Sequence, residues 1–251
     1  MVDFTGGTWR SLIDGSEVGG IPDAAIHQWR FDEGAGETVS DSVGSEDGTI
    51  SGADWTSNDW EGGWALDGDG TGDYVSTGEL GDFGENLHTD FALIATVETN
   101  DDSGTIMGVF HDPGDASTNA MEFGFDIEFD GDAGKIALRL RDDDGDPYTI
   151  QTDSRFDDGG RYRVVANKVA NSGSDGIEIW INGEKVETTV ESDGGFDDPT
   201  SNFTVDMGIL ARNNDGTFDR HLDGIIDNVI ITDDSLSESE IKGDYNNQPW
   251  S

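Results

Sequence analysis

The chain has 251 residues, no cysteine, and 55 acidic residues against 13 Lys and Arg, which gives a formal net charge of −42. Its length allows one large β domain or two small ones. A disulfide scaffold is excluded without cysteine, and no apolar run approaches the ~20 residues of a membrane span. Nucleic-acid binding is disfavoured because phosphate contact depends on basic patches.

The negative charge has two interpretations. Low hydrophobicity with a high net charge is typical of disorder. A folded protein adapted to molar salt has the same composition, because the Debye length falls to about 3 Å at 1 M salt and self-repulsion is then screened. The acidic residues are spread along the whole chain between apolar alternations. The sequence therefore predicts a folded protein from a halophilic setting that loses structure at low salt.

Residues 1–24 differ in pattern from the rest of the chain. Apolar residues are scattered there among Gly and acidic residues: Trp9, Leu12, Ile13, Val18 and Ile21. We interpret this segment as an arm that docks on other copies of the chain or on a partner, with a mobile leader as the alternative. The start has no basic or apolar region of a signal peptide. We therefore expect a cytoplasmic protein, a chain trimmed of its leader, or a virion component released by lysis.

From residue 25 to 251 the pattern predicts an all-β sandwich with one short C-terminal helix. Short apolar alternations recur between Gly, Asp and Asn turns, at the spacing of an antiparallel sandwich. Asn182-Gly183 is a strong hairpin turn, and Ser237 with Glu240 forms a capping box that starts a helix over 237–246. The expected strands are Ile26–Phe31, Gly48–Ala53, Ala65–Leu66, Tyr74–Thr77, Phe91–Glu98, Thr105–Phe110, Met121–Phe129, Lys135–Arg141, Tyr148–Thr152, Arg161–Val169, Gly176–Ile181, Lys185–Val190, Phe203–Ala211 and Leu222–Thr232.

Five groups of residues occur in an order that matches a known family. They are His27–Gly36, Asp41–Gly44 with Asp47–Thr49, Trp64–Gly68 with Gly72–Val75, Ile177–Gly183, and Leu222–Asp227 with Leu236–Ile241 and Tyr245. In this order the chain resembles the laminin-G-like jelly rolls of the concanavalin-A-like lectin/glucanase fold over about 26–247. The resemblance implies two curved antiparallel sheets, often a structural Ca²⁺, and frequent binding of glycans or proteins.

A Ca²⁺ site is expected at Asp41 and Asp227. Ca²⁺ takes about 6–8 oxygen ligands, usually from carboxylates and the carbonyls of a tight loop. The 41–49 loop offers Asp41 and Asp47, and in similar jelly rolls the strand that carries Asp227 lies beside the first strand. The alternative is ordinary turn chemistry in an acidic chain. The acidic runs at 67–73 and 142–146 are interpreted as solvated hairpin turns.

Glu122, Asp126, Glu128 and Asp130 share one face of an expected strand, which is also a feature of the retaining glucanases of this fold. We expect no enzyme, because Gly124 stands where the middle carboxylate of those enzymes would be. If the chain turns about 131–134, Asp126 lies opposite Arg139 and the carboxylates become cross-strand ion pairs. The four histidines are far apart in sequence and indicate no catalytic triad.

A ligand-binding face is predicted from Trp180, Arg139, Arg141 and Arg163. Trp180 alternates with core residues, so it points away from the core, where its ring would stack on a sugar while the guanidinium groups bind hydroxyls or carboxylates. The alternative places Trp180 under a loop or the helix. Two further places are a loop with Trp55 and Trp60, and the loop from Arg212 to His221.

These inferences predict a binding protein without catalysis. Our leading hypothesis is a virion surface protein of a virus of halophilic archaea, a turret, spike or fibre that binds a host-surface glycan or an S-layer-type glycoprotein. Residues 1–24 would join it to further copies and to other virion proteins, and neither nucleic acid nor membrane insertion is expected. The alternatives are a purely structural decoration protein of a capsid or tail, or a glycoside hydrolase.

Overall fold

The structure is a computed structural model that describes residues 2–5, 8–11, 17–18, 22–58, 63–80, 90–111, 119–126, 133–141, 146–169, 176–193 and 206–246. Over these residues it contains no helix that is long and apolar enough to span a membrane.

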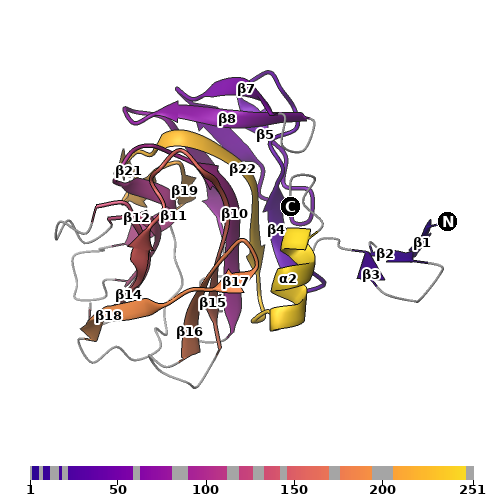
Figure 1. The fold of residues 1–251 in the computed structure, drawn as a ribbon. Coiled ribbons are helices and arrows are strands. Elements are labelled where there is room, and N and C mark those ends of the chain that lie inside the picture. Colours follow the sequence, from indigo (N-terminus) through magenta and orange to yellow (C-terminus); the bar gives the residue numbers. More distant parts are fainter. Residues whose placement is uncertain are drawn as a thin grey trace.

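Two large sheets face each other (Figure 1). The first, called the back sheet, has the order β17 (Glu184–Lys185), β16 (Ile177–Ile181), β15 (Arg161–Lys168), β10 (Phe91–Glu98), β22 (Asp223–Thr232), β8 (Gly63–Asp69) and β7 (Asp54–Asn58), with β4 (Ala25–Trp29) also paired to β22. All of its pairs are antiparallel.

The second sheet, called the front sheet, has the order β18 (Thr188–Asp193), β14 (Pro147–Arg155), β13 (Lys135–Arg141), β12 (Asn119–Phe125), β11 (Gly104–His111), β19 (Asp206–Ile209), β9 (Tyr74–Glu79), β6 (Gly48–Ser51) and β5 (Thr38–Val39). A hairpin of β20 (Arg212–Asn214) and β21 (Thr217–Asp219) also joins it, because β20 pairs with β11 in parallel. The antiparallel sandwich predicted from the sequence is confirmed.

The main hydrophobic core lies between the two sheets and follows the period-2 alternation of the strands. In β13, for example, Ile136, Leu138 and Leu140 are buried in this core, whereas Arg139 and Arg141 are only half-buried. Large side chains such as Trp29 and Phe123 are fully buried there. Each such apolar side chain contributes about 1.5–3 kcal/mol when it leaves water.

A second, smaller core lies on the outer face of the back sheet, under helix α2 (Glu238–Asn246) (Figure 1). Its members are Ala92, Ile94, Val165, Trp180, Ile230, Leu236 and Ile241. The predicted capping box is present, since the backbone N–H of Ser237 donates to the Glu240 carboxylate at 2.8 Å. The helix therefore starts where the sequence predicts it, and it covers this face of the sheet.

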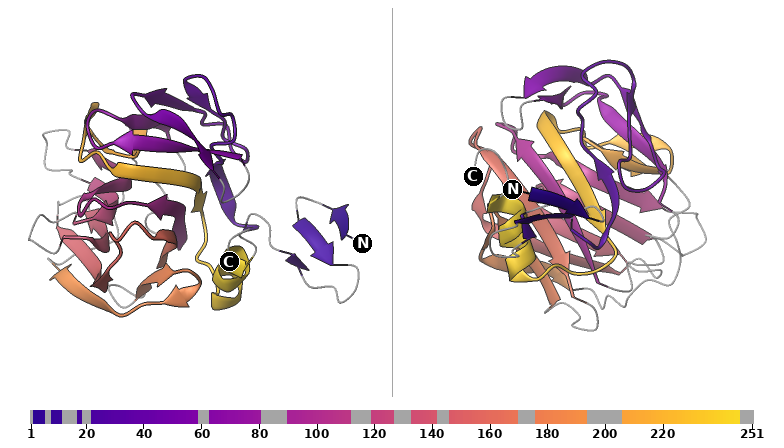
Figure 2. Two further views of the ribbon diagram at one scale, coloured as in Figure 1. Left: turned by 45° about the horizontal axis from the view of Figure 1, so that its top comes forward. Right: turned by 90° about the vertical axis from the view of Figure 1, so that its right-hand side faces the viewer.

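Near the N-terminus, β1 (Val2–Thr5), β2 (Thr8–Ser11) and β3 (Glu17–Val18) form a sheet of their own. Figure 2 shows this sheet to one side of the sandwich. The role of residues 1–24 in docking stays a prediction.

The expected pairing of β12 with β13 is wrong by four residues. Glu122, and not Asp126, lies opposite Arg139, and Gly124 lies opposite Ala137. The physical reason is that β12 ends at Phe125: Asp126 adopts a positive φ of 43° and turns the chain, so the connection is longer than a turn at 131–134. Residues 127–132, with Glu128 and Asp130, lie outside the described residues.

Candidate functional site

A row of polar residues crosses the outer face of the front sheet. Cross-strand pairing places one residue from each of seven strands in line: Ser192, Thr149, Arg139, Glu122, Gly108, Arg212 and Asp219. Because the neighbours of Arg139 and Glu122 along their strands are core residues, the side chains of this row point away from the core. The register of the sheet thus gathers charged groups from distant parts of the sequence.

Glu122 is the centre of this row, and its side chain is only 1% exposed. The hydroxyl of Thr105 donates to its Oε1 at 2.7 Å. Two guanidinium groups form ion pairs with it: Arg220 Nε lies 2.9 Å from Oε1, and Arg212 Nη1 lies 3.3 Å from Oε2. Burial raises the pKa of Glu122, although the charges of Arg220, Arg212 and Arg139 and the Thr105 hydrogen bond oppose this.

The hairpin β20–β21 holds Arg212 in a fixed position. Its guanidinium donates to both carboxylate oxygens of Asp219 at 2.9 Å, which is the two-bond geometry that fixes an arginine most firmly. The ring of Phe218 stacks on Tyr74 of β9 with 3.7 Å between centroids, and so anchors the hairpin to the front sheet. Arg220, just after the hairpin, donates from Nη2 to the backbone carbonyl of Asp126 at 2.9 Å.

Phe110 adds an apolar ring to this polar surface. The guanidinium carbons of Arg141 and Arg212 lie 5.8 Å and 5.3 Å from its centroid, within the range of cation–π attraction. We call the surface formed by Arg139, Arg141, Arg212, Arg220 and Phe110 the arginine face. It holds four of the nine arginines of a chain whose net charge is −42. Of these, Arg139 and Arg141 are half-buried and lie on the same side of β13.

The predicted face around Trp180 is not assembled. Arg139 and Arg141 belong to the front sheet, whereas Trp180 and Arg163 belong to the back sheet, under α2. Trp180 is 6% exposed and Arg163 is 1% exposed. Arg163 donates to both carboxylate oxygens of Asp244 of α2 at 2.8 and 3.0 Å. The predicted face is not assembled because helix α2 covers Trp180 and Arg163. A position of Trp180 under the helix is the alternative that the sequence left open.

Asp41 organises a loop with both of its carboxylate oxygens. Its Oδ1 accepts the backbone N–H groups of Gln28, Val43 and Gly44, and its Oδ2 accepts that of Glu46 and lies 2.6 Å from His27 Nδ1. Both oxygens are therefore already used by protein donors.

Asp227 lies elsewhere, beside Thr96 and in the same row as Arg163 on the back sheet. No group of three or more His, Asp or Glu side chains that could hold a metal occurs in the part of the chain that the structure describes. Asp41 bridges to Trp29, which pairs with Val229 and not with Asp227, so the two carboxylates lie in different rows, and Ca²⁺ binding stays a prediction.

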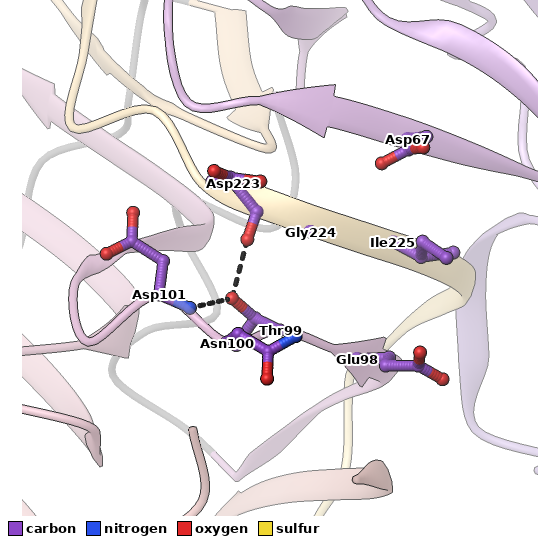
Figure 3. Close-up of a pocket in the computed structure, with 8 residues that line it drawn as sticks. All are labelled: Asp67, Glu98, Thr99, Asn100, Asp101, Asp223, Gly224 and Ile225. Carbon is purple, nitrogen blue, oxygen red and sulfur yellow. Dashed lines mark hydrogen bonds between the residues drawn. The ribbon is translucent and has the colours of Figure 1, made fainter. Parts of the chain in front are cut away.

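A cavity of about 420 Å³ lies at the end of β8, β10 and β22 (Figure 3). It is lined by Asp67, Glu98, Thr99, Asn100, Asp101, Asp223, Gly224 and Ile225. Burial and the charges of Asp223, Asp54 and Asp73 raise the pKa of Asp67. This concentration of carboxylates repels anions, whereas the guanidinium groups of the arginine face attract them.

Two smaller predictions have different outcomes. Trp55 packs against the main core and donates from Nε1 to the carbonyl of Gly36 at 2.9 Å, while Trp60 lies outside the described residues. The predicted loop from Arg212 to His221 carries two of the four arginines of the arginine face. The sequence indicates that Glu122 is an outward carboxylate. The parallel pairing of β20 with β11 brings Arg212 to it, and no pattern in the sequence predicts that pairing.

The facing sheets, their register and the outer helix define a concanavalin-A-like jelly roll. The chain belongs to the concanavalin A-like lectin/glucanases superfamily, because the Laminin_G_3 family model matches residues 69–242. No curated protein sequence matches this chain.

Several solved structures share the fold. The receptor binding domain of botulinum neurotoxin C/D mosaic serotype is 13% identical with a TM-score of 0.62, over 89% of this chain and 51% of that one. The serotype D ligand binding domain in complex with N-acetylneuraminic acid is 14% identical with a TM-score of 0.62, over 90% and 51%. Trypanosoma rangeli sialidase in complex with sialic acid is 14% identical with a TM-score of 0.58, over 92% and 34%. The chain thus spans about a third to a half of their lengths.

Proposed function

We propose that this protein binds an acidic carbohydrate through the arginine face. The observation that carries the proposal is the convergence of four arginines on one sheet face of a chain with a net charge of −42. Two of the structures that share the fold hold sialic acid, which is a carboxylate sugar, according to their descriptions. That likeness supports the ligand class.

The chemistry of the face suits such a ligand. Guanidinium groups bind carboxylates and sulfates with two parallel hydrogen bonds. Arg139 and Arg141 are two residues apart on one strand, so their Cα atoms are separated by about 6–7 Å, which is the span of a single sugar ring. The ring of Phe110 offers an apolar surface for the C–H face of a sugar.

The arrangement favours binding over hydrolysis. A retaining glycosidase needs an acid and a nucleophile about 5–5.5 Å apart on either side of the sugar bond. The Glu122 carboxylate is instead surrounded by Arg212, Arg220 and Thr105, and Asp219 is held by Arg212. Both carboxylates therefore serve as counter-ions. Release of free sugar from a sialylated substrate that depends on Glu122 would favour the enzyme alternative.

The setting of this activity is the surface of a particle or cell in high salt, as the composition suggests, with a virion of a halophilic archaeal virus as the specific case. Residues 1–24, which contain a separate small sheet, link copies there. Deletion of residues 1–24 is expected to leave a folded monomer. Light scattering after size exclusion would contradict this role if the oligomer were unchanged.

The binding site is tested with two arginine variants. In Arg139→Ala and Arg141→Ala, loss of a charge-assisted hydrogen bond worth about 1.5–3 kcal/mol is expected to weaken binding of N-acetylneuraminic acid at least about tenfold. Arg155→Ala is the control, because Arg155 is an exposed arginine of the same sheet that pairs with Asp157. Titration calorimetry would run at the lowest salt that preserves the near-UV circular dichroism. Unchanged affinity in both variants would refute the site.

A further inference from the structure

Glu122 connects the arginines of the face to one another. It forms ion pairs with Arg212 of β20 and with Arg220 after β21, and it lies directly opposite Arg139 of β13. Gly108, between Glu122 and Arg212 in the row, has no side chain to separate them. The like charges of these guanidinium groups repel one another, and Glu122 is the anion that offsets this repulsion while no ligand is bound. Glu122 is therefore in a position to fix where they point.

We propose that Glu122 is the positioning residue of this site, and that an acidic ligand binds the arginine face together with one proton, which Glu122 takes up. The inference rests on the proposed function and specifies how the site is regulated.

The proton is expected because ligand and Glu122 share the same cations. An incoming carboxylate places a second negative charge near a buried one, and the repulsion between two such charges is stronger in a protein site than in bulk water. A nearby like charge raises the pKa of a carboxyl group. Burial acts in the same direction, since it already raises the pKa of Glu122.

The groups around Glu122 can accommodate the neutral form. The Thr105 hydroxyl, which donates to Oε1, can rotate and accept a hydrogen bond from the protonated carboxyl. Arg212 keeps both bonds to Asp219, and Arg220 keeps its bond to the Asp126 carbonyl. Protonation thus removes one negative charge from the face and leaves its scaffold in place.

In the part of the chain that the structure describes, few other charged or titratable groups lie close enough to Glu122 to be the source of the proton uptake. Among the described residues, Arg139 faces Glu122 from β13, Arg212 and Asp219 from the hairpin, and Arg220 from the segment after it. His221, the one histidine beside this cluster among the described residues, follows Arg220, and its Nδ1 lies 2.9 Å from the Asp73 carbonyl oxygen. A proton taken up by His221 would persist when Glu122 is replaced, which separates the two sources.

Thermodynamic linkage gives the sign of the effect. If binding takes up a proton, affinity falls as pH rises, by at most about tenfold per pH unit for one proton. The carboxyl group of the ligand does not contribute to the proton uptake above pH 5. Such a group has a pKa of about 3.5 when the neighbouring carbon carries an electronegative substituent.

The experiment is titration calorimetry of N-acetylneuraminic acid between pH 5 and 8, in two buffers with different ionisation enthalpies. Wild type is expected to take up a fraction of a proton that approaches one, with tighter binding at low pH. Glu122→Gln resembles the protonated state, so it is expected to bind with a pH-independent affinity near the low-pH value of wild type and to take up no proton. Glu178→Gln on the back sheet is the control and is expected to behave as wild type.

The outcomes separate the two proposals. Wild-type binding with no proton uptake and a flat pH profile would overturn the role of Glu122 and leave acidic-sugar binding intact. Uptake that persists in Glu122→Gln would overturn it as well. No binding by wild type at any pH would overturn both. If Glu122→Gln does not fold, His221→Gln replaces it in the test, and loss of the proton uptake in that variant would overturn the role of Glu122.

Discussion

Asp41 shows how a single carboxylate organises the edge of this sandwich. It gathers four backbone N–H groups and the ring of His27, which stacks on Trp29 of the main core with 5.5 Å between centroids. Although burial raises its pKa, the His27 contact and the amides of Gln28, Gly44 and Glu46 outweigh it, and the net pKa lies below the ordinary value. The charged form is therefore the one that the folded loop stabilises.

We expect Asp41→Asn to lower the free energy of unfolding by about 1.5–3 kcal/mol at pH 7, the usual contribution of a hydrogen bond to a charged group. Because the folded pKa is lowered, this stabilisation is present above the ordinary pKa of 3.8 and is lost as pH falls through the folded value. Urea unfolding at pH 7 and pH 3 measures it. Asp32→Asn, which replaces an exposed carboxylate, is the control. If Asp41→Asn were as stable as this control, Asp41 would not stabilise the loop.

At the scale of elements, helix α2 is fastened to the back sheet by a buried ion pair and a small apolar cluster. Arg163 bonds to Asp244 of the helix, to Thr96 of β10 and to the carbonyl of Asn228 of β22. Trp180 and Ile241 pack in the same layer. The helix thus closes the outer face of the back sheet.

Replacing Asp244 tests this fastening. Asp244→Ala leaves Arg163 buried without its carboxylate, and breaking one partner of a buried pair costs about 3–5 kcal/mol. Trp180 is expected to become exposed, with a red-shifted and more easily quenched fluorescence. Lys242→Ala, on the exposed side of the same helix, is expected to change stability by at most about 0.5 kcal/mol. Equal effects of the two substitutions would show that the ion pair is not what holds α2.

Features that depend on neighbouring residues could be predicted from the sequence, whereas features that depend on contacts between distant segments could not. Most of the long strands, the Asn182-Gly183 turn and the start of α2 are set by alternation and local capping, and they were predicted. The short strands β5, β7, β20 and β21 were not, and Lys185–Val190, expected as one strand, is divided between β17 and β18 of different sheets. The register of β12 with β13 depends on Asp126 turning the chain early, so it was not. Trp180 was placed correctly on the outer face, but its cover comes from a helix more than fifty residues away. The arginine face was only partly predicted, because it depends on Arg212 of β20 reaching Glu122 of β12 across the intervening strand β11.

At the scale of the whole molecule, the charge of −42 acts against both folding and binding of an anion. At about 0.1 M salt the Debye length is about 10 Å, and at 1 M it is about 3 Å, so salt removes most of the repulsion between surface carboxylates. The acidic cavity concentrates this repulsion, since Asp67 lies directly opposite Asp54 and its pKa is raised. The arginine face is the local exception to the overall field.

We expect Asp67→Asn to stabilise the fold by about 0.2–1 kcal/mol near 0.1 M salt, the size of a cross-strand charge effect. The sign follows from the raised pKa of Asp67, because a carboxylate that ionises with difficulty in the folded state destabilises that state at pH 7. Thermal unfolding measures the change, and it should vanish at molar salt. The same gain in high salt would show that repulsion is not its cause.

Binding of an acidic sugar at the arginine face is the property we propose for the whole molecule. The most direct measurement is a crystal structure of the chain with N-acetylneuraminic acid. We predict the sugar carboxylate within hydrogen-bond distance of Arg139 or Arg141, with the ring against Phe110. A sugar held instead in the acidic cavity or against α2, with the arginine face unchanged, would contradict the account.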